Sequence, residues 1–188
     1  MSVFLGIGLS AACGFRVFLP LLVLSIAALS GVIPLADEFL WIASLPALIV
    51  FGTAMVCEII AYYIPFVDNT LDTVATPLAV IAGVVVSASI LTDLDPLYRW
   101  SLALIAGGGA AGLVQGSTAL LRVKSSALTG GLGNFLVATV ELFGSLFLSL
   151  IAILVPLIAL ALVLVVLFVA YRFTHKLAFG RRATSSPT

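Results

Sequence analysis

Three ionisable side chains, Arg16, Glu58 and Glu141, stand inside long apolar runs of this sequence. No charged residue precedes Arg16, and none follows it until Asp37. An ionisable group at membrane depth is costly, so it normally faces a partner, a polar cavity or water. Arg16 can therefore bind an anionic group, and either glutamate can carry a proton. Each of the three can equally belong to a buried structural ion pair.

Two further polar residues are candidates for the same substrate-binding site. Tyr62 lies four residues after Glu58 and therefore shares its helix face. Gln115 lies in another apolar run, beside a glycine-rich face. Two carboxylates near one another would allow one of them to hold a proton, for a proton-coupled step or in a silent hydrogen bond. The sequence thus predicts a site formed by Arg16, Glu58, Tyr62, Gln115 and Glu141.

Charged residues also gather at two expected loops on one side of the membrane. Asp68 and Asp72 lie just before one apolar run, and Arg122 and Lys124 follow another. Acidic residues near a helix start often only complement the helix dipole. We also consider that the acidic and basic pairs face each other as a gate. We expect no metal site, because two carboxylates without further oxygen ligands bind a cation poorly.

The composition indicates a membrane protein. Of the 188 residues, 63% are hydrophobic and 9% are charged, whereas soluble domains have about 25% charged residues. The apolar runs are about 20 residues long and lack the alternation of barrel strands, so they predict helices. We expect an all-α, polytopic transmembrane helix bundle. Residues 1–176 would form one domain, and residues 177–188 would form a disordered polar tail.

Several functional classes find no support in the sequence. The net charge is zero, so no basic surface indicates a nucleic-acid partner. His175 is the only histidine and lies among basic residues near the C-terminus. No nucleophile–base arrangement or nucleotide-binding fingerprint is present. We therefore expect neither an enzyme nor a bound cofactor.

The first apolar segment is too long for one straight span. Residues 3–34 would form a helix of about 48 Å, whereas the hydrocarbon core is about 30 Å thick. Gly14 and Pro20 flank Arg16, and both weaken a helix. Either the segment breaks near Arg16, which then points into a polar cavity, or residues 17–34 span and Arg16 marks the interface. With this broken or re-entrant segment we expect about six spans, the others near 44–64, 73–92, 100–121, 134–152 and 155–173.

Six spans would place both termini on one side of the membrane. Most basic residues gather on that side, and the positive-inside rule makes it the cytoplasmic one. We therefore expect a multi-pass protein of the cell inner membrane, in contact with the lipid bilayer, with both termini in the cytoplasm. The basic residues expected on this side are Arg122, Lys124, Arg172, Lys176, Arg181 and Arg182.

Three glycines in the fourth expected span predict close helix packing. Gly108, Gly112 and Gly116 form two overlapping G-x-x-x-G steps. Small residues at this spacing allow another helix to approach closely. That helix could belong to the same chain or to a partner, so we also consider a homo-oligomer.

The N-terminal motif GLSAACGFRVFLPLL, with Glu58, the segment IPFVD at 64–68, Asp72 and Pro77, resembles a bacterial membrane family catalogued as domain of unknown function 4126. The resemblance covers most of the chain up to about residue 150. Tyr62-Tyr63 stands where the family often has a charged pair, and SSALTGGLGN stands where it is often acidic. The resemblance implies that Arg16, Pro20, Glu58, Asp68, Asp72 and Glu141 match motif positions. It implies no particular activity.

Two functions fit these residues. The first is a small transporter or channel-like protein for an anionic solute or a lipid phosphate, with proton coupling through Glu58 or Glu141. The second is a structural or partner-binding membrane subunit, in which the polar residues pair internally. Substrate flux would distinguish the first from the second.

Overall fold

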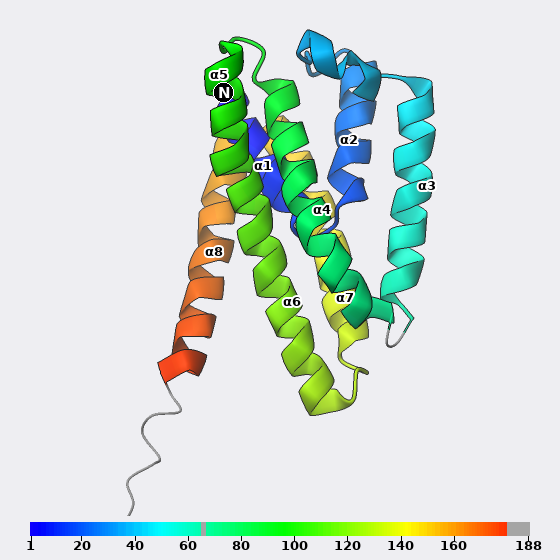
Figure 1. Ribbon diagram of the computed structural model, residues 1–188, viewed down its shortest axis with the longest axis vertical. Coiled ribbons are helices and arrows are strands. Elements are labelled where there is room, and N and C mark those ends of the chain that lie inside the picture. Colours follow the sequence, from blue (N-terminus) through cyan, green and yellow to red (C-terminus); the bar gives the residue numbers. More distant parts are fainter. Residues whose placement is uncertain (65–66, 180–188) are drawn as a thin grey trace, which may run out of the picture.

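The computed structural model describes residues 1–64 and 67–179, and every regular element there is a helix (Figure 1). This confirms the predicted all-α bundle. In the described residues, four helical stretches are long and apolar enough to cross a membrane. They are Leu45–Tyr62, Thr70–Ile90, Pro96–Thr129 and Asn134–Leu154.

The first apolar segment is broken into two short helices, α1 (Ser2–Cys13) and α2 (Phe18–Leu29). Each has 12 residues and is therefore about 18 Å long, little more than half of a bilayer core. The prediction of a broken or re-entrant segment is confirmed. The alternative of one span over residues 17–34 does not hold, because α2 ends at Leu29.

Both short helices open toward the same end of the bundle. Near the start of α1, a methyl group at Gly6 would lie 3.2 Å from Ser87 Oγ. After α2, the amide of Ala36 donates to the carbonyl of Ser89 at 2.9 Å. Ser87 and Ser89 belong to the last turns of α4 (Val67–Ile90). The chain therefore enters beside the end of α4, turns near Arg16 and returns, which is a re-entrant hairpin.

The remaining helices lie where the other five spans are predicted, and in the described residues four of these five regions are long and apolar enough to cross a membrane. A short 3₁₀ helix, η1, connects α2 to α3. The helices α5, η2 and α6 follow one another without a loop, and η2 has π-helical geometry. The elements are η1 (Asp37–Ile42), α3 (Leu45–Tyr62), α4 (Val67–Ile90), α5 (Pro96–Leu102), η2 (Ala103–Gly108), α6 (Gly109–Thr129), α7 (Asn134–Leu154) and α8 (Pro156–Phe179).

Local sequence signals explain where several of these helices begin. The side chain of Ser44 accepts a hydrogen bond from the amide of Ala47 in α3, and that of Asp95 accepts one from the amide of Leu97 in α5. Pro156 is the first residue of α8, where its missing amide proton costs nothing. The long apolar run after Asn134 therefore folds back at Pro156, as the sequence predicts.

The two ends of the described chain lie at opposite ends of the bundle (Figure 1). The N-terminus lies at the end of the bundle where α5 begins, and α8 runs toward the end where α6 and α7 join. The prediction of both termini on one side counted the first segment as a full crossing. Because this segment turns back as a hairpin and does not cross, the number of crossings is one fewer and the two ends lie at opposite ends of the bundle. Residues 180–188, which include most of the predicted tail, lie outside the described residues.

Helix α1 occupies the centre of the bundle, where it packs against α4, α6, α7 and α8. Small residues make this possible: a methyl group at Gly8 would lie 2.9 Å from Ala152 Cβ. A methyl group at Gly14 would lie 2.5 Å from the carbonyl oxygen of Ala111. Close packing of small residues replaces the hydrophobic driving force that is missing between helices in lipid. It also fixes the hairpin turn deep inside the protein.

Candidate functional site

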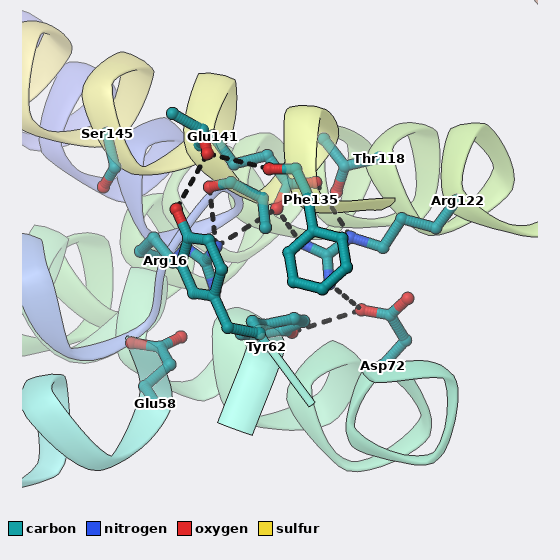
Figure 2. A network of polar contacts seen from close by, with 12 residues as sticks. Arg16, Glu58, Tyr62, Asp72, Thr118, Arg122, Phe135, Glu141 and Ser145 are labelled. Carbon is teal, nitrogen blue, oxygen red and sulfur yellow. Dashed lines mark hydrogen bonds and ion pairs between the residues drawn. The ribbon is translucent and has the colours of Figure 1, made fainter. Parts of the chain in front are cut away.

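Arg16 lies at the turn of the hairpin and is almost completely buried, with 1% of its surface exposed. Its Nη2 donates to the carbonyl of Ala138 in α7 at 2.8 Å and lies 3.8 Å from Glu141 Oε2. Among the described residues, its Nε and Nη1 have no hydrogen-bond partner. Figure 2 shows Arg16 between Glu58 of α3 and Glu141 of α7. The predicted arginine is thus buried among carboxylates and still has unused donors.

Glu58 holds the beginning of α2. Its carboxylate accepts hydrogen bonds from the backbone amides of Val17 at 2.8 Å and Phe18 at 3.2 Å. The first amides of a helix have no partner within the helix, and the helix dipole favours a negative charge there. Val17 provides no side-chain cap. Glu58 of α3 therefore caps α2 from outside and ties the hairpin to the bundle.

Arg122 of α6 forms the most extensively paired part of the cluster. Its Nε donates to Glu141 Oε1 at 3.2 Å, and its Nη2 forms an ion pair with Glu141 Oε2. Its Nη1 lies 3.5 Å from Asp72 Oδ1 of α4. Two contacts from one guanidinium to one carboxylate fix both side chains in direction as well as in distance. Arg122 thus joins α4, α6 and α7 in the interior.

Tyr62 of α3 lies between the two arginines. The Arg16 and Arg122 guanidinium carbons are 4.1 Å and 3.9 Å from its ring centroid. Its hydroxyl donates to Asp72 Oδ1 at 3.1 Å. An aromatic face attracts a cation, and this attraction strengthens where water is excluded. Tyr62 therefore holds two like charges close to one another.

The charges of this cluster nearly balance. Its described members are two arginines and three carboxylates, each at most 9% exposed. The negative charge of Glu58 is stabilised by hydrogen bonds from backbone amides at the start of α2. The other side chains are two arginines and two carboxylates, whose charges balance. We name these five residues and Tyr62 the central cluster. They are Arg16, Glu58, Tyr62, Asp72, Arg122 and Glu141.

Two cavities border the central cluster. One has a volume of about 270 Å³, lies among α2, α3 and α4, and is lined mainly by apolar side chains together with Glu58 and Tyr62. The other has a volume of about 410 Å³, lies between α4 and α6, and reaches Asp72. Its walls carry Thr73, Thr76 and Ser126, so it is the more polar of the two.

Most residues of the predicted substrate site meet in the central cluster. Arg16, Glu58, Tyr62 and Glu141 lie together. Gln115 is buried, and its backbone amide lies beside Gly14 at the hairpin turn.

The residues of the predicted gate have different positions. Asp72 and Arg122 form an ion pair, but both are buried within the central cluster. Lys124 is half-buried two residues further along α6. The side chain of Asp68 lies outside the described part of the chain.

The three predicted packing glycines do not share one environment. Gly108 and Gly112 face α4, where added methyl groups would lie 2.9 Å from Val84 and 3.1 Å from Val80. Gly116 has nothing within 4 Å of the position of such a methyl group. The close helix neighbour of this face is therefore α4 of the same chain.

A separate ion pair lies at the opposite end of α4, outside the central cluster. Arg99 of α5 donates to Glu38 of η1 at 2.6 Å, with the Glu38 side chain 59% exposed and the Arg99 side chain 7% exposed. The hydrogen bond from Arg99 holds the pKa of Glu38 below its ordinary value. This contact fastens η1 to α5.

The fold and the site define a class of protein: a polytopic helical membrane protein with a re-entrant first segment and a buried arginine–carboxylate cluster. In the described residues, no group of three or more His, Cys, Asp or Glu side chains could hold a metal ion.

Residues 3–176 match the family described as domain of unknown function (DUF4126), and the chain belongs to this family. This confirms the resemblance seen in the sequence and extends it beyond residue 150. No curated protein and no solved structure matches the chain.

Proposed function

We propose that the protein is a small transporter or channel-like protein for compact anions and that Arg16 is the anion-binding residue. The observation that carries this proposal is the pair of buried Arg16 nitrogens, Nε and Nη1, that have no hydrogen-bond partner in the described part of the chain. Leaving a buried donor unpaired is costly, and more so when the group is charged. A guanidinium only donates hydrogen bonds, so its natural ligand is an acceptor with negative charge.

The hairpin supports this proposal independently. Many transporters bind their substrates near the middle of the membrane, where helices are interrupted and their ends face the ligand. Here the interruption between α1 and α2 contains Arg16, and the first amides of α2 already hold the carboxylate of Glu58. The same turn could therefore accommodate further negative charge next to the arginine.

The shared chemistry of the ligand is a small negatively charged group, such as chloride or a phosphate. A phosphate could come from solution or from a lipid head group. The apolar cavity among α2, α3 and α4 would suit a lipid chain, and the more polar cavity beside Asp72 would suit a soluble anion. The experiment below separates these sources.

We also propose an orientation and a location. Lys124 and Arg172 lie toward the end where α6 and α7 join, and the positive-inside rule places such an end in the cytoplasm. The C-terminus would then be cytoplasmic and the N-terminus would be on the other side of the inner membrane. Cysteine labelling of each terminus in intact cells tests this orientation, and labelling of both termini from the same side would contradict it.

A second candidate function is that of a structural or partner-binding subunit, which includes a homo-oligomer. It is favoured by the internal pairing among Tyr62, Asp72, Arg122 and Glu141. Such a role would need no ligand at Arg16. We propose transport rather than catalysis for the central cluster, because its side chains bind one another in ion pairs and hydrogen bonds.

Flux through reconstituted liposomes tests the main proposal. Uptake of radioactive chloride and phosphate and scrambling of a fluorescent phosphatidylglycerol form three separate arms. At least one arm should respond to the protein, and Arg16→Gln should abolish that response. Arg99→Gln is the matched control, because it removes an arginine outside the central cluster and should leave the flux unchanged. Absence of flux in all three arms, or flux that Arg16→Gln leaves intact, would overturn the proposal.

A further inference from the structure

The charges of the central cluster limit how an anion can be bound there. With Glu58 held by the amides of α2, the remaining side chains are Arg16, Arg122, Asp72 and Glu141, and their formal charges sum to zero. All four are at most 8% exposed. A monovalent anion at Arg16 would leave the buried group with a net negative charge. Burying a net charge is strongly unfavourable, so a compensating positive charge must enter with the anion.

Glu141 is the carboxylate best placed to receive that charge as a proton. It is in contact with both arginines: Oε2 lies 3.8 Å from Arg16 Nη2, and the carboxylate pairs with Arg122 through two atoms. An anion that used the free nitrogens of Arg16 would therefore lie close to Glu141. Their mutual repulsion disappears when Glu141 is protonated.

The other two carboxylates of the central cluster have different roles. Glu58 accepts two backbone amides and stabilises the hairpin turn. Asp72 is bound by Arg122 and by the hydroxyl of Tyr62, and it lines the cavity between α4 and α6. Asp72 and Glu141 are thus the two carboxylates paired with Arg122, and Asp72 is the one that borders this cavity.

We propose that the protein binds one proton on Glu141 with each monovalent anion at Arg16, so that transport is electrically neutral. This proposal rests on the proposed function and names its coupling. Among the described residues, Glu141 contacts Arg16 from the hairpin and Arg122 from α6. Tyr62 of α3 and Asp72 of α4 contact these arginines, and Tyr63 of α3 shares a hydrogen bond with Thr139 of α7 at 2.8 Å. The proton comes from water on the side from which the anion enters. It returns to water when the anion leaves, so both are conserved in each cycle.

Electrical neutrality has a measurable consequence in liposomes. With one proton for each anion, a gradient of one pH unit can support about a tenfold anion gradient at zero membrane potential. The probe is radioactive chloride, or phosphate at a pH where it is a monoanion. The potential is held at zero with potassium and valinomycin. We expect accumulation when the outside is acidic, and no accumulation when a potential is imposed at uniform pH.

The variant Glu141→Gln places an uncharged group at the same position. We expect it to retain exchange of internal for external anion and to lose accumulation driven by the pH gradient. The matched control Glu38→Gln alters a carboxylate outside the central cluster, which pairs with Arg99, and should keep that accumulation. Both variants are first checked for a single folded species by size-exclusion chromatography. If Glu141→Gln does not fold, accumulation by the unaltered protein under a pH gradient at zero potential decides whether transport is coupled to protons.

The outcomes separate this inference from the proposed function. Anion uptake that Arg16→Gln abolishes, but that follows the membrane potential and ignores the pH gradient, would overturn the coupling alone. Accumulation by Glu141→Gln at the level of the unaltered protein would overturn the role of Glu141. Absence of any anion uptake would overturn the proposed function, and the coupling with it.

Discussion

Replacing Arg122 by methionine removes the central charge of the cluster while keeping a long apolar side chain in its place. Arg122 Nε is 3.2 Å from Glu141 Oε1, and two unit charges at that separation attract by about 5 kcal/mol at an effective dielectric constant of about 20. The variant leaves Glu141 with only the longer contact to Arg16, and it weakens the pairing of Asp72. Removing one partner of a buried ion pair costs about 3–5 kcal/mol. We expect Arg122→Met to lower the free energy of unfolding by this amount.

The assay is unfolding by SDS in mixed micelles, followed by the fluorescence of Trp41 and Trp100. Arg99→Met is the matched control, because its partner Glu38 is exposed and water can solvate the remaining carboxylate. An ion pair with an exposed partner contributes little to stability. The double variant Arg122→Met/Glu141→Gln should recover part of the loss. If Arg122→Met costs no more than Arg99→Met, the buried cluster does not stabilise the fold and our reasoning is refuted.

Three further changes test the hairpin and the outer ion pair. Gly14→Ala should cost about 1–3 kcal/mol or more of unfolding free energy, because the new methyl group would lie 2.5 Å from a backbone carbonyl of α6. Gly116→Ala has open space and should be neutral or stabilising, and equal effects of the two variants would contradict the packing of α1. Glu58→Ala should cost about 1–3 kcal/mol and speed amide exchange at Val17 and Phe18, an effect that Glu58→Gln should partly reverse; unchanged exchange would exclude the cap. Because Arg99 lowers the pKa of Glu38, their pair stabilises the protein above the ordinary glutamate pKa of about 4.3. That contribution disappears as the pH falls through the lower folded-state value. Glu38→Gln should therefore flatten the acid side of the stability profile, and a profile identical to that of the unaltered protein would exclude this contribution.

Much of this architecture could be predicted from the sequence because the signals are strong in an apolar chain. A single arginine in a long uncharged segment, flanked by Gly14 and Pro20, indicated a break, and the structure has one between Cys13 and Phe18. Glu58 and Glu141 stood out for the same reason. Membrane burial makes every isolated charge informative.

The direction of the hairpin could not be predicted in the same way. Two helices of 12 residues can continue across a membrane or turn back, and composition is the same in both cases. The choice depends on how α1 packs against α4, through contacts such as Gly6 with Ser87. These contacts join residues far apart in the sequence. For the same reason, the sequence could not predict that the N-terminus lies at the end of the bundle opposite to the end of α8.

The partners within the site were also hidden from the sequence. Glu58 binds main-chain amides of Val17 and Phe18, and Arg16 binds the carbonyl of Ala138. Backbone groups are present at every residue, so no residue type marks them. Asp72 and Arg122 were expected in loops, but α4 begins at Val67 and α6 continues to Thr129. The helices therefore carry both side chains into the interior.

The central claim is that the free donors of Arg16 bind an anion, and the most direct test is an experimental structure in lipid with bromide, located by its anomalous scattering. We expect a bromide peak within hydrogen-bond distance of Arg16 Nε or Nη1, and no such peak in Arg16→Gln. A structure of the unaltered protein without bromide at Arg16, in which protein groups occupy both nitrogens, would contradict the account.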